Sequence, residues 1–371
     1  MENRSENGSN DDLNRRITEL EKELAKEKLK SKKVENAFTM AQDELRAISD
    51  KLLETTKQQQ QLLQSASSAG QTSGGKPQFT AKMTHELRTP LNGILGMSDL
   101  LLKTSLNGEQ RDQALVINES AKALLELIND FLDFSRIQSG RAELEIIDFE
   151  LTASVEAIAD LLSDQAKRKG IELISYVSPR LPAVLKGDPG SIRQVLLNLV
   201  SNAVKFTDRG SVFMEAELLE AQENDQIMVR FSVKDTGIGI DNVDTAKLFE
   251  PFTQANLAVK REFGGTGLGL TISKGLVNLM GGELSVASEK GKGSNFWFDV
   301  PFQQVGGGMG GTATRALNGR IALVVSAFQP MSKVLDSYAN AWGMRVINTD
   351  SIESTLTMLS QVAQQPQAGA V

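Results

Sequence analysis

A heptad repeat restricts the N-terminal part of the chain to one long helix. Fifteen positions from Leu13 to Leu62 follow one another at alternating spacings of four and three residues, and eleven of them are apolar. Such a seam is typical of a coiled coil, most simply a parallel dimer, which we expect over residues 1–64. The polar seam positions 27, 31, 55 and 59 would weaken it locally. The alternative is a long solvated helix that packs on nothing.

Two segments are predicted to be flexible linkers. Residues 65–78 are rich in Ser, Gly and Gln, and a coil of that composition would span about 20 Å. Residues 304–318 contain a second glycine-rich run. The 371 residues suffice for two or three domains around these linkers.

Composition excludes several kinds of chemistry. The chain has no cysteine and one histidine, so disulfides, thiolate catalysis and Cys or His metal clusters are excluded. The net charge of -7 predicts no nucleic-acid partner. No apolar run reaches the roughly 18 residues that span a bilayer, and the polar N-terminus is unlike a signal peptide. We therefore expect no direct membrane insertion and a cytoplasmic location.

Residues 79–140 are predicted to form a helical hairpin. The first half places Met83, Leu87, Leu91, Ile94 and Leu101 on one helical face. The second half has a mainly apolar series at spacings of three or four residues: Ala114, Ile117, Ala121, Leu124, Ile128, Phe131 and Ser135. The turn is placed at 106–108, where Asn-Gly favours positive backbone angles, and the second helix should stop at Gly140. One hairpin cannot bury both faces, so we expect a homodimer that forms a four-helix bundle.

The single histidine, His85, lies in the first half of this hairpin. Glu86 follows it directly, so a carboxylate can hold one imidazole nitrogen while the other acts as nucleophile. Pro90 removes a helical hydrogen bond to the Glu86 carbonyl, which predicts a bend beneath His85. The alternative is that a lone histidine is an ordinary surface or core residue.

Residues 148–303 alternate helical and strand patterns, which indicates an α/β or α+β domain. The patterns predict helices at 152–169, 189–206 and about 266–280, and strands at 171–177, 211–219 and 226–235, with two more strands ending near 302. Residues 319–371 begin with a strand at 321–325 that its apolar run marks as buried. A helix through Trp342, a strand at 345–348 and another helix follow. This βαβα segment is too short to close a parallel sheet with helices on both faces.

Three motifs in this domain suggest nucleotide chemistry. Asn198 and Asn202 lie four residues apart on one helical face, and Lys205 follows within a turn, which suits a Mg²⁺–phosphate pair. Asp235 ends a strand and could accept a hydrogen bond from an amine such as that of adenine. The glycines Gly237 and Gly239 behind it let the backbone approach a ligand closely.

The third motif, at 264–270, consists of glycines that run into a helix, whose N-terminus forms an anion site. Each motif alone is weak, because such glycines usually form turns and such asparagines usually cap helices. The third motif follows a polar loop rather than a strand, which argues against a dinucleotide-binding fold. The Walker pattern is absent, so the chain is not a P-loop NTPase.

Taken in order, these segments resemble the sensor histidine kinases of two-component signalling, over about residues 79–303. The shared features are the histidine box, the asparagine box, glycine boxes at 235–239 and 264–269, and a phenylalanine box with Phe252. The resemblance implies a dimerisation and phosphotransfer hairpin at 79–140. It also implies a Bergerat-type ATP-binding α/β two-layer sandwich at 148–303, shared with gyrase, mismatch-repair and chaperone ATPases.

The resemblance also implies the cofactors, ATP and Mg²⁺, and a role for each site residue. Asn202 would be the principal Mg²⁺ ligand with Asn198 beside it, while Lys205 would contact phosphate and Asp235 the adenine amine. Residues 253–263 would be a mobile lid from which Arg261 reaches the γ-phosphate; the lysine that the family places next to it is Glu262 here. The remaining nucleotide-binding residues are Gly237, Gly239, Phe252, Gly265, Thr266, Gly267, Leu268 and Gly269.

The implied reaction transfers the γ-phosphoryl group of ATP to His85, with Glu86 as general base or orienting group. The phosphoryl group would pass to an aspartate of a response-regulator receiver domain. Thr89 stands where the family can position a water molecule to dephosphorylate that partner.

Residues 319–371 resemble the start of a receiver domain, as in hybrid kinases. Residues 325–328 stand where an acidic pair should hold Mg²⁺, and the chain stops before the strand that would carry the phosphoacceptor. We expect no competent phosphorelay aspartate there, whether the receiver is cut short or degenerate.

Two other functions compete with this interpretation. An ATPase of the same fold, of the chaperone or repair type, would leave the histidine box unexplained. A non-catalytic scaffold that dimerises through its coiled coil would not need Asn202, Asp235 or the glycines.

Overall fold

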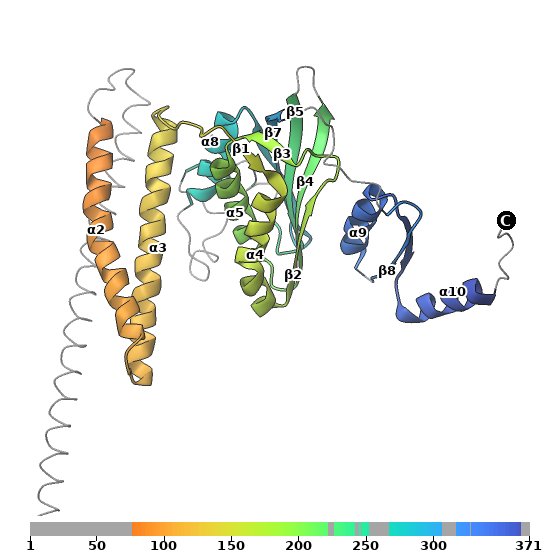
Figure 1. The fold of residues 1–371 in the computed structure, drawn as a ribbon. Helices are drawn as coiled ribbons and strands as arrows, with labels where there is room; N and C mark the ends of the chain where they lie inside the picture. Colours follow the sequence, from red (N-terminus) through yellow and green to blue (C-terminus); the bar gives the residue numbers. More distant parts are fainter. Residues whose placement is uncertain are drawn as a thin grey trace, which may run out of the picture. The chain divides into compact units, whose positions relative to one another are not determined.

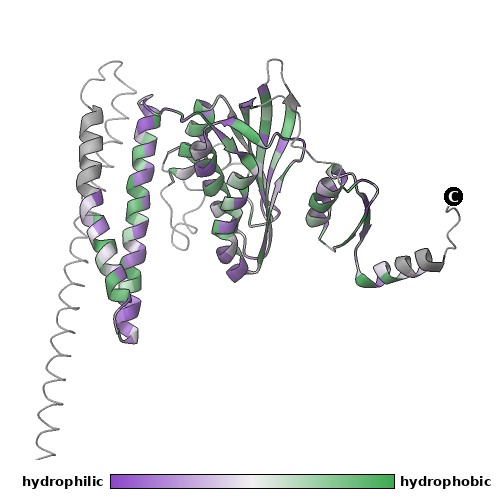
Figure 2. Ribbon diagram, viewed as in Figure 1, coloured by the Kyte–Doolittle hydropathy of each residue, from purple (hydrophilic) through white to green (hydrophobic). Residues whose placement is uncertain are grey.

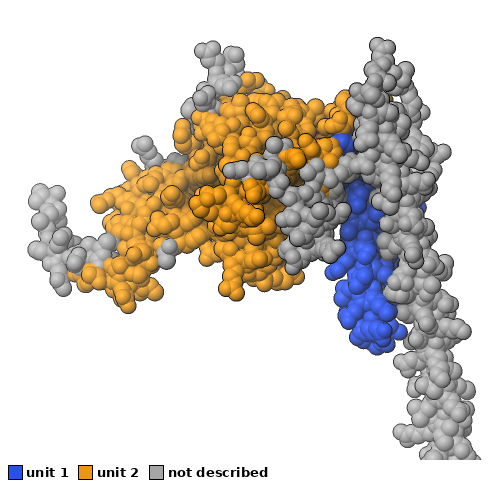
Figure 3. All heavy atoms as spheres, turned by 180° about the vertical axis from the view of Figure 1, so that it is seen from behind, with its two compact units in different colours: residues 1–135 blue, residues 136–371 orange. Residues whose placement is uncertain are grey.

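The computed structural model describes residues 76–221, 226–241, 245, 247–251, 267–305, 317–326 and 328–364, with the side chains of 76–87, 220–221, 358–359 and 361–364 left out. The predicted coiled coil at 1–64 and most of both linkers lie outside these ranges. Two compact units divide the chain, residues 1–135 and 136–371, and each is treated by itself (Figure 3). Within the described ranges, no helix combines the length and the hydropathy that a bilayer span requires.

The first unit contains the predicted hairpin, made by α2 (Lys76–Leu102) and the greater part of α3 (Gly108–Gln138). Its core is formed by apolar side chains of the predicted stripes: Leu91, Ile94, Ile117, Ala121, Leu124 and Ile128. Figure 2 shows hydrophobic and hydrophilic residues alternating along α3 and along the coloured part of α2. The first helix begins at Lys76, inside the predicted linker, and continues through Pro90.

The turn between the two helices is where we expected it, but our reason for it was wrong. Asn107 caps α3: the Gln110 N–H donates to Asn107 Oδ1 at 2.8 Å, and the Asn107 N–H donates to Gln110 Oε1 at 3.2 Å. This reciprocal capping box satisfies two N–H groups at the helix start. Gly108 is the first residue of α3 and does not have a positive φ.

A buried amide crosses the hairpin where the apolar stripe predicted nothing polar. Asn118 is 3 % exposed, and its Nδ2 donates to Ser98 Oγ and to Asp99 Oδ1, both at 2.8 Å. A shift in the register of the two helices would leave this amide buried without its partners, which is costly. The network therefore favours one register of α2 against α3.

The second unit is built around a seven-stranded sheet. Its elements, in chain order, are β1 (Ile147–Glu150), α4 (Leu151–Lys169), β2 (Ile171–Val177), β3 (Val184–Gly187), α5 (Pro189–Phe206), β4 (Gly210–Ala221), β5 (Gln226–Asp235), α8 (Gly269–Leu279), β6 (Glu283–Glu289) and β7 (Gly293–Gln304). The strand order is β1-β3-β7-β5-β4-β2, with β6 paired to β7, and β2 with β4 is the one parallel pair.

Helices α4, α5 and α8 cover one face of this sheet (Figure 1), which confirms the predicted two-layer α/β sandwich. Along β5, alternate residues from Ile227 to Asp235 are buried on the helix side. Phe231 and Phe298 stack there with their ring centroids 4.9 Å apart. The sequence missed β1 and β3, because four-residue strands are too short to show a two-residue period.

The C-terminal elements are β8 (Ile321–Val325), α9 (Gln329–Ala341), β9 (Arg345–Thr349) and α10 (Ile352–Gln364), and β8 pairs with β9 in parallel. The prediction that β8 is buried was wrong except at Val324, which is 8 % exposed. Ile321 is 58 % exposed and Val325 is 42 % exposed. A sheet of two strands leaves apolar side chains uncovered, because the layers that bury a parallel strand on both faces are missing.

The sequence did not predict that α9 packs on the second face of the larger sheet. Ile174, Tyr176 and Val334 are buried together there, with Phe213, Phe328, Met331 and Tyr338 against them. Tyr176 and Ser337 share a hydrogen bond of 2.6 Å between their hydroxyl oxygens. The Val177 N–H donates to Tyr338 Oη at 3.2 Å, so the tyrosine covers a backbone donor on the edge strand β2. Burial raises the pKa of Tyr338, which keeps its phenol neutral.

Replacing Tyr338 with Phe should expose this edge donor. One lost hydrogen bond is worth about 1 kcal/mol, so we expect the Val177 amide to exchange with solvent roughly fivefold faster. Hydrogen exchange followed by NMR measures this directly. Tyr176→Phe is the matched control, since it removes the bond to Ser337 and leaves the acceptor for Val177 in place. An unchanged exchange rate in Tyr338→Phe would contradict the contact.

The same face of the sheet holds an unusual acid, Glu215 on β4. Burial, and then the neighbouring Glu217, raise the pKa of Glu215 from 4.5 to about 7. A folded-state pKa above the unfolded value means that stability is lost as the pH rises from about 4.5 to 7.

We expect Glu215→Gln to flatten that part of the curve of unfolding free energy against pH. Urea denaturation at pH 5 and pH 8 tests this, and an equal pH dependence in both proteins would count against it.

Candidate functional site

Helix α5 presents the predicted asparagine pair because its opposite face is buried. The helix starts at an N-cap, Asp188, whose Oδ1 accepts from the Ser191 N–H at 2.9 Å, and Pro189 occupies its first turn. Its buried apolar residues are Ile192, Val195, Leu196, Leu199, Val200, Ala203 and Val204. Asn198, Asn202 and Lys205 fall between them in the helical period and remain partly exposed.

The two amides are linked to each other and to helix α8. Asn202 Nδ2 donates to Asn198 Oδ1 at 3.1 Å, and Asn198 Nδ2 donates to Ser273 Oγ at 2.8 Å. Ser273 is almost fully buried on α8. The sequence motifs missed Ser273, although its spacing of four residues from Gly269 would have placed both on one face of that helix.

The start of α8 lies directly against this pair. A Cβ atom added at Gly269, the first residue of α8, would come within 2.5 Å of Asn198 Oδ1, so only glycine fits there. Gly267 before it has a φ of +68°, and the fully buried Leu268 is the N-cap without a side-chain cap. Backbone N–H groups at a helix start attract anions, and here they lie beside two amides that could offer oxygen to a cation.

The predicted glycine turn after β5 packs on the other end of α5. Asp235 is 7 % exposed, and its Oδ1 accepts from the Gly237 N–H at 2.8 Å and the Ser294 N–H at 3.2 Å. Burial raises the pKa of Asp235, while these donors oppose the shift. A Cβ at Gly237 would lie 2.4 Å from the Phe206 carbonyl oxygen, so this close approach requires glycine. Gly239 follows with a φ of +62°.

The structure thus brings Asn198, Asn202, Lys205, Asp235 and the start of α8 together around one helix. Among the described residues, no group of three or more His, Cys, Asp or Glu side chains is placed to hold a metal ion. Amide oxygens suit Mg²⁺ when phosphate oxygens and water complete its shell, so the donor set fits a phosphate-bound cation better than a dedicated metal cage.

The other predicted site residues lie either in the first unit or outside the described residues. His85, Glu86 and Thr89 lie on α2 in the first unit, where Thr89 is exposed and the side chains of the other two are not described. Phe252, Arg261, Gly265 and Thr266 fall outside the described residues.

Two domain families match this chain. Residues 76–140 match the His Kinase A phospho-acceptor domain. Residues 187–304 match the family described as histidine kinase-, DNA gyrase B- and HSP90-like ATPase. The second match covers α5, α8 and the glycine turn, which are the elements that form the cluster.

Proteins of similar sequence are named as histidine kinases. The sensor histidine kinase GacS of Pseudomonas protegens is 39 % identical over 293 residues, which is 79 % of this chain and 32 % of that protein. BarA of Escherichia coli K12, a signal transduction histidine-protein kinase, is 43 % identical over 225 residues, or 61 % of this chain and 24 % of that one. The chain therefore spans a third or less of these relatives.

A solved structure is also similar. The full-length ShkA in complex with AMPPNP is 37 % identical, with a TM-score of 0.64, and the match covers 76 % of this chain and 57 % of that one. With a phosphoacceptor-type hairpin, an ATPase-type sandwich and such relatives, the chain belongs to the sensor histidine kinases of two-component signalling.

Proposed function

We propose that this chain is an ATP-dependent histidine kinase of the hybrid type that phosphorylates itself on His85. The phosphoryl group then passes to an aspartate of a response-regulator receiver domain. The observation that carries the proposal is the junction of α5 and α8, where Asn198 joins Asn202 to Ser273 beside a helix N-terminus. A similar kinase whose structure holds AMPPNP, an ATP analogue, supports the same use of this fold.

ATP would bind around α5 with its base at Asp235. The two backbone N–H groups on Oδ1 orient the carboxylate so that it can accept from the adenine amine. The phosphates would lie at the start of α8 near Leu268 and Gly269, with Lys205 as a neighbouring cation. Asn202, with Asn198 beside it, would supply oxygen to a Mg²⁺ ion carried by the phosphates.

The lid residues complete this proposal outside the described part of the chain. Residues 253–263 would form a lid over the nucleotide, from which Arg261 would reach the γ-phosphate. Phe252, Gly265 and Thr266 would contact the nucleotide beside this lid. A guanidinium stabilises the charge that spreads over the transferring phosphoryl group.

In the transfer step, a ring nitrogen of His85 forms a bond to the γ-phosphorus while the bond from phosphorus to the β–γ bridging oxygen breaks. ADP leaves with that oxygen, and Glu86 accepts or holds the proton on the other ring nitrogen. Catalysis is mainly placement, because an oriented pair of reactants can reach effective molarities of about 10⁵–10⁸ M. Thr89, exposed on α2, would position water for dephosphorylation of the receiver.

The proposed assembly is a homodimer. Met97 and Leu100 on α2, and Leu115 and Val116 on α3, are large apolar residues exposed on a single hairpin. Burial against a second copy in a four-helix bundle would cover such residues. The coiled coil at 1–64 would add a second contact. The net charge of -7 supports a protein partner rather than nucleic acid, and we propose that the chain acts in the cytoplasm without direct membrane insertion.

Replacing His85 with Gln should abolish phosphorylation while ATP still binds. With γ-labelled ATP and Mg²⁺, the native protein should acquire label that survives alkali and is lost in acid, and the variant should acquire none. Because His85 is the only histidine, no other imidazole could take the label. ATP hydrolysis without any label in the native protein would favour the chaperone-type ATPase instead.

Replacing Asp235 with Asn should weaken adenine binding. Loss of a charged hydrogen bond in a buried site costs about 1.5–3 kcal/mol, which is roughly a ten- to hundredfold rise in the Kd of ATP. The raised pKa of Asp235 means that native affinity should fall as acidification protonates this carboxyl, whereas the variant should lose that dependence. Titration calorimetry across pH measures both effects, with the exposed Asp208→Asn as control. Equal affinity for ATP and GTP in the native protein would contradict the role of Asp235.

A further inference from the structure

The ammonium group of Lys169 holds the end of the asparagine-bearing helix. Lys169 is the last residue of α4 and is partly buried. Its Nζ donates to the carbonyl oxygens of Val204 at 2.9 Å, Lys205 at 2.7 Å and Thr207 at 3.2 Å. Three acceptors match the three N–H groups of an ammonium, so the side chain is fully engaged.

Two of these acceptors, the carbonyls of Val204 and Lys205, are groups that α5 cannot satisfy itself, and the third belongs to its C-cap, Thr207. The last four carbonyls of a helix have no partner within it, and they carry the negative end of the helix dipole. A lysine placed there from α4 supplies both donors and positive charge. The remaining carbonyl of this stretch, that of Phe206, accepts instead from the Ile238 N–H at 3.3 Å, in the glycine turn after Asp235.

The side chain of Thr207 does not anchor this turn by a hydrogen bond among the described residues. Thr207 is fully buried, and its hydroxyl finds no hydrogen-bond partner in the part of the chain that the structure describes. The turn is therefore held through its backbone, by Lys169 on three carbonyls and by the glycine turn on one. Asn202 and Lys205 lie just before this turn, so the contacts that hold the turn also fix where these two residues lie.

We infer that Lys169 is a positioning residue for the ATP site. It fixes the end of α5 and so sets the spacing between Asn202 and Lys205 on one side and Asp235 on the other. Lys169 itself touches none of the proposed ligand's groups; it acts through the α5 backbone. This inference rests on the proposed ATP site, but the structural link that it describes can be measured without nucleotide.

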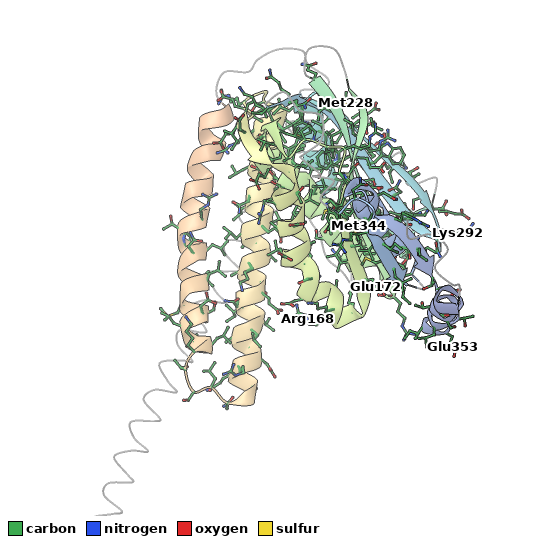
Figure 4. All side chains as sticks on the ribbon, turned by 45° about the vertical axis from the view of Figure 1, so that its right-hand side comes forward. Arg168, Glu172, Met228, Lys292, Met344 and Glu353 are labelled. Atoms are coloured by element: carbon green, nitrogen blue, oxygen red, sulfur yellow. The ribbon has the colours of Figure 1, made fainter. Side chains whose placement is uncertain are left out.

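The experiment compares Lys169→Met with Arg168→Met. The first variant keeps the aliphatic stem and removes the donors. The second removes an equal charge from the exposed neighbouring position in the last turn of α4, labelled in Figure 4. Both are studied in the full chain, below the melting temperature of each variant. The readouts are the Kd of Mg²⁺–ATP and, without nucleotide, the exchange rate of the Ile238 amide.

We expect Lys169→Met to raise the Kd of Mg²⁺–ATP about tenfold and to speed Ile238 exchange by a similar factor, while Arg168→Met matches the native protein. A role in stability alone would lower the melting temperature and leave both readouts unchanged, which would overturn the inference. If the native protein binds no ATP, the proposed function fails, and Ile238 exchange still decides whether Lys169 positions the turn.

A second variant covers the case in which Lys169→Met does not fold. The chain contains no cysteine, so Lys169→Cys can be alkylated at one position with 2-bromoethylamine, which rebuilds a lysine-like ammonium. Restoration of ATP affinity and of slow Ile238 exchange by this treatment supports the inference. A folded, aminoethylated protein that stays impaired would contradict it, because the charge and its reach have then been returned.

Discussion

The burial of one face of α5 against the sheet is the interaction on which the ATPase-type domain depends. Six Ile, Val and Leu side chains of this helix are buried. At about 1.5–3 kcal/mol each, they contribute on the order of 10 kcal/mol before entropy is counted. That burial fixes the rotation of the helix about its axis. With the rotation fixed, Asn198, Asn202 and Lys205 must face the opposite side, where α8 and the glycine turn meet them.

Close packing then explains why weak motifs become a specific site. Gly269 admits the Asn198 amide, and Gly237 admits the Phe206 carbonyl, at distances that a Cβ atom would forbid. Gly269 therefore lets the Asn198 side chain lie against the backbone of α8. Gly237 lets the turn after β5 lie against the end of α5. Backbone donors on Asp235 and side-chain bonds between Asn202, Asn198 and Ser273 hold polar groups in place before any ligand arrives. Such preorganisation lowers the cost of ordering the site when a ligand binds.

The second face of the same sheet has a different role. Its apolar residues on β2 and β4 receive α9, and Tyr338 covers the exposed backbone donor of Val177. The C-terminal βαβα elements therefore have a packing partner although their own two-stranded sheet leaves Ile321 and Val325 exposed. Helix α9 lies outside both matched domain ranges, so the family matches do not describe this contact.

Local periodicity let the sequence determine most helices and the longer strands. The 3.6-residue stripe marked Ile117, Ala121 and Leu124 as core, and the glycine–asparagine motifs marked the ends of α5, β5 and the start of α8. Such signals work because each depends on neighbours within one or two turns of the chain. The strands β1 and β3 are too short to show such a period, and the exposure of β8 depends on layers far from it in the chain. The capping box of Asn107 and Gln110 is local, so the sequence could have revealed it.

Only the tertiary structure decided the contacts between distant segments. Lys169 meets carbonyls some 35 positions further on, Asn118 meets Ser98 across a turn, and Tyr338 of helix α9 meets Val177 of strand β2. None of these residues carries a mark in its local sequence: a lysine that ends a helix looks the same whether it faces water or caps another helix. Their partners are set by how the burial of apolar faces folds the chain back on itself, which no short window of sequence contains.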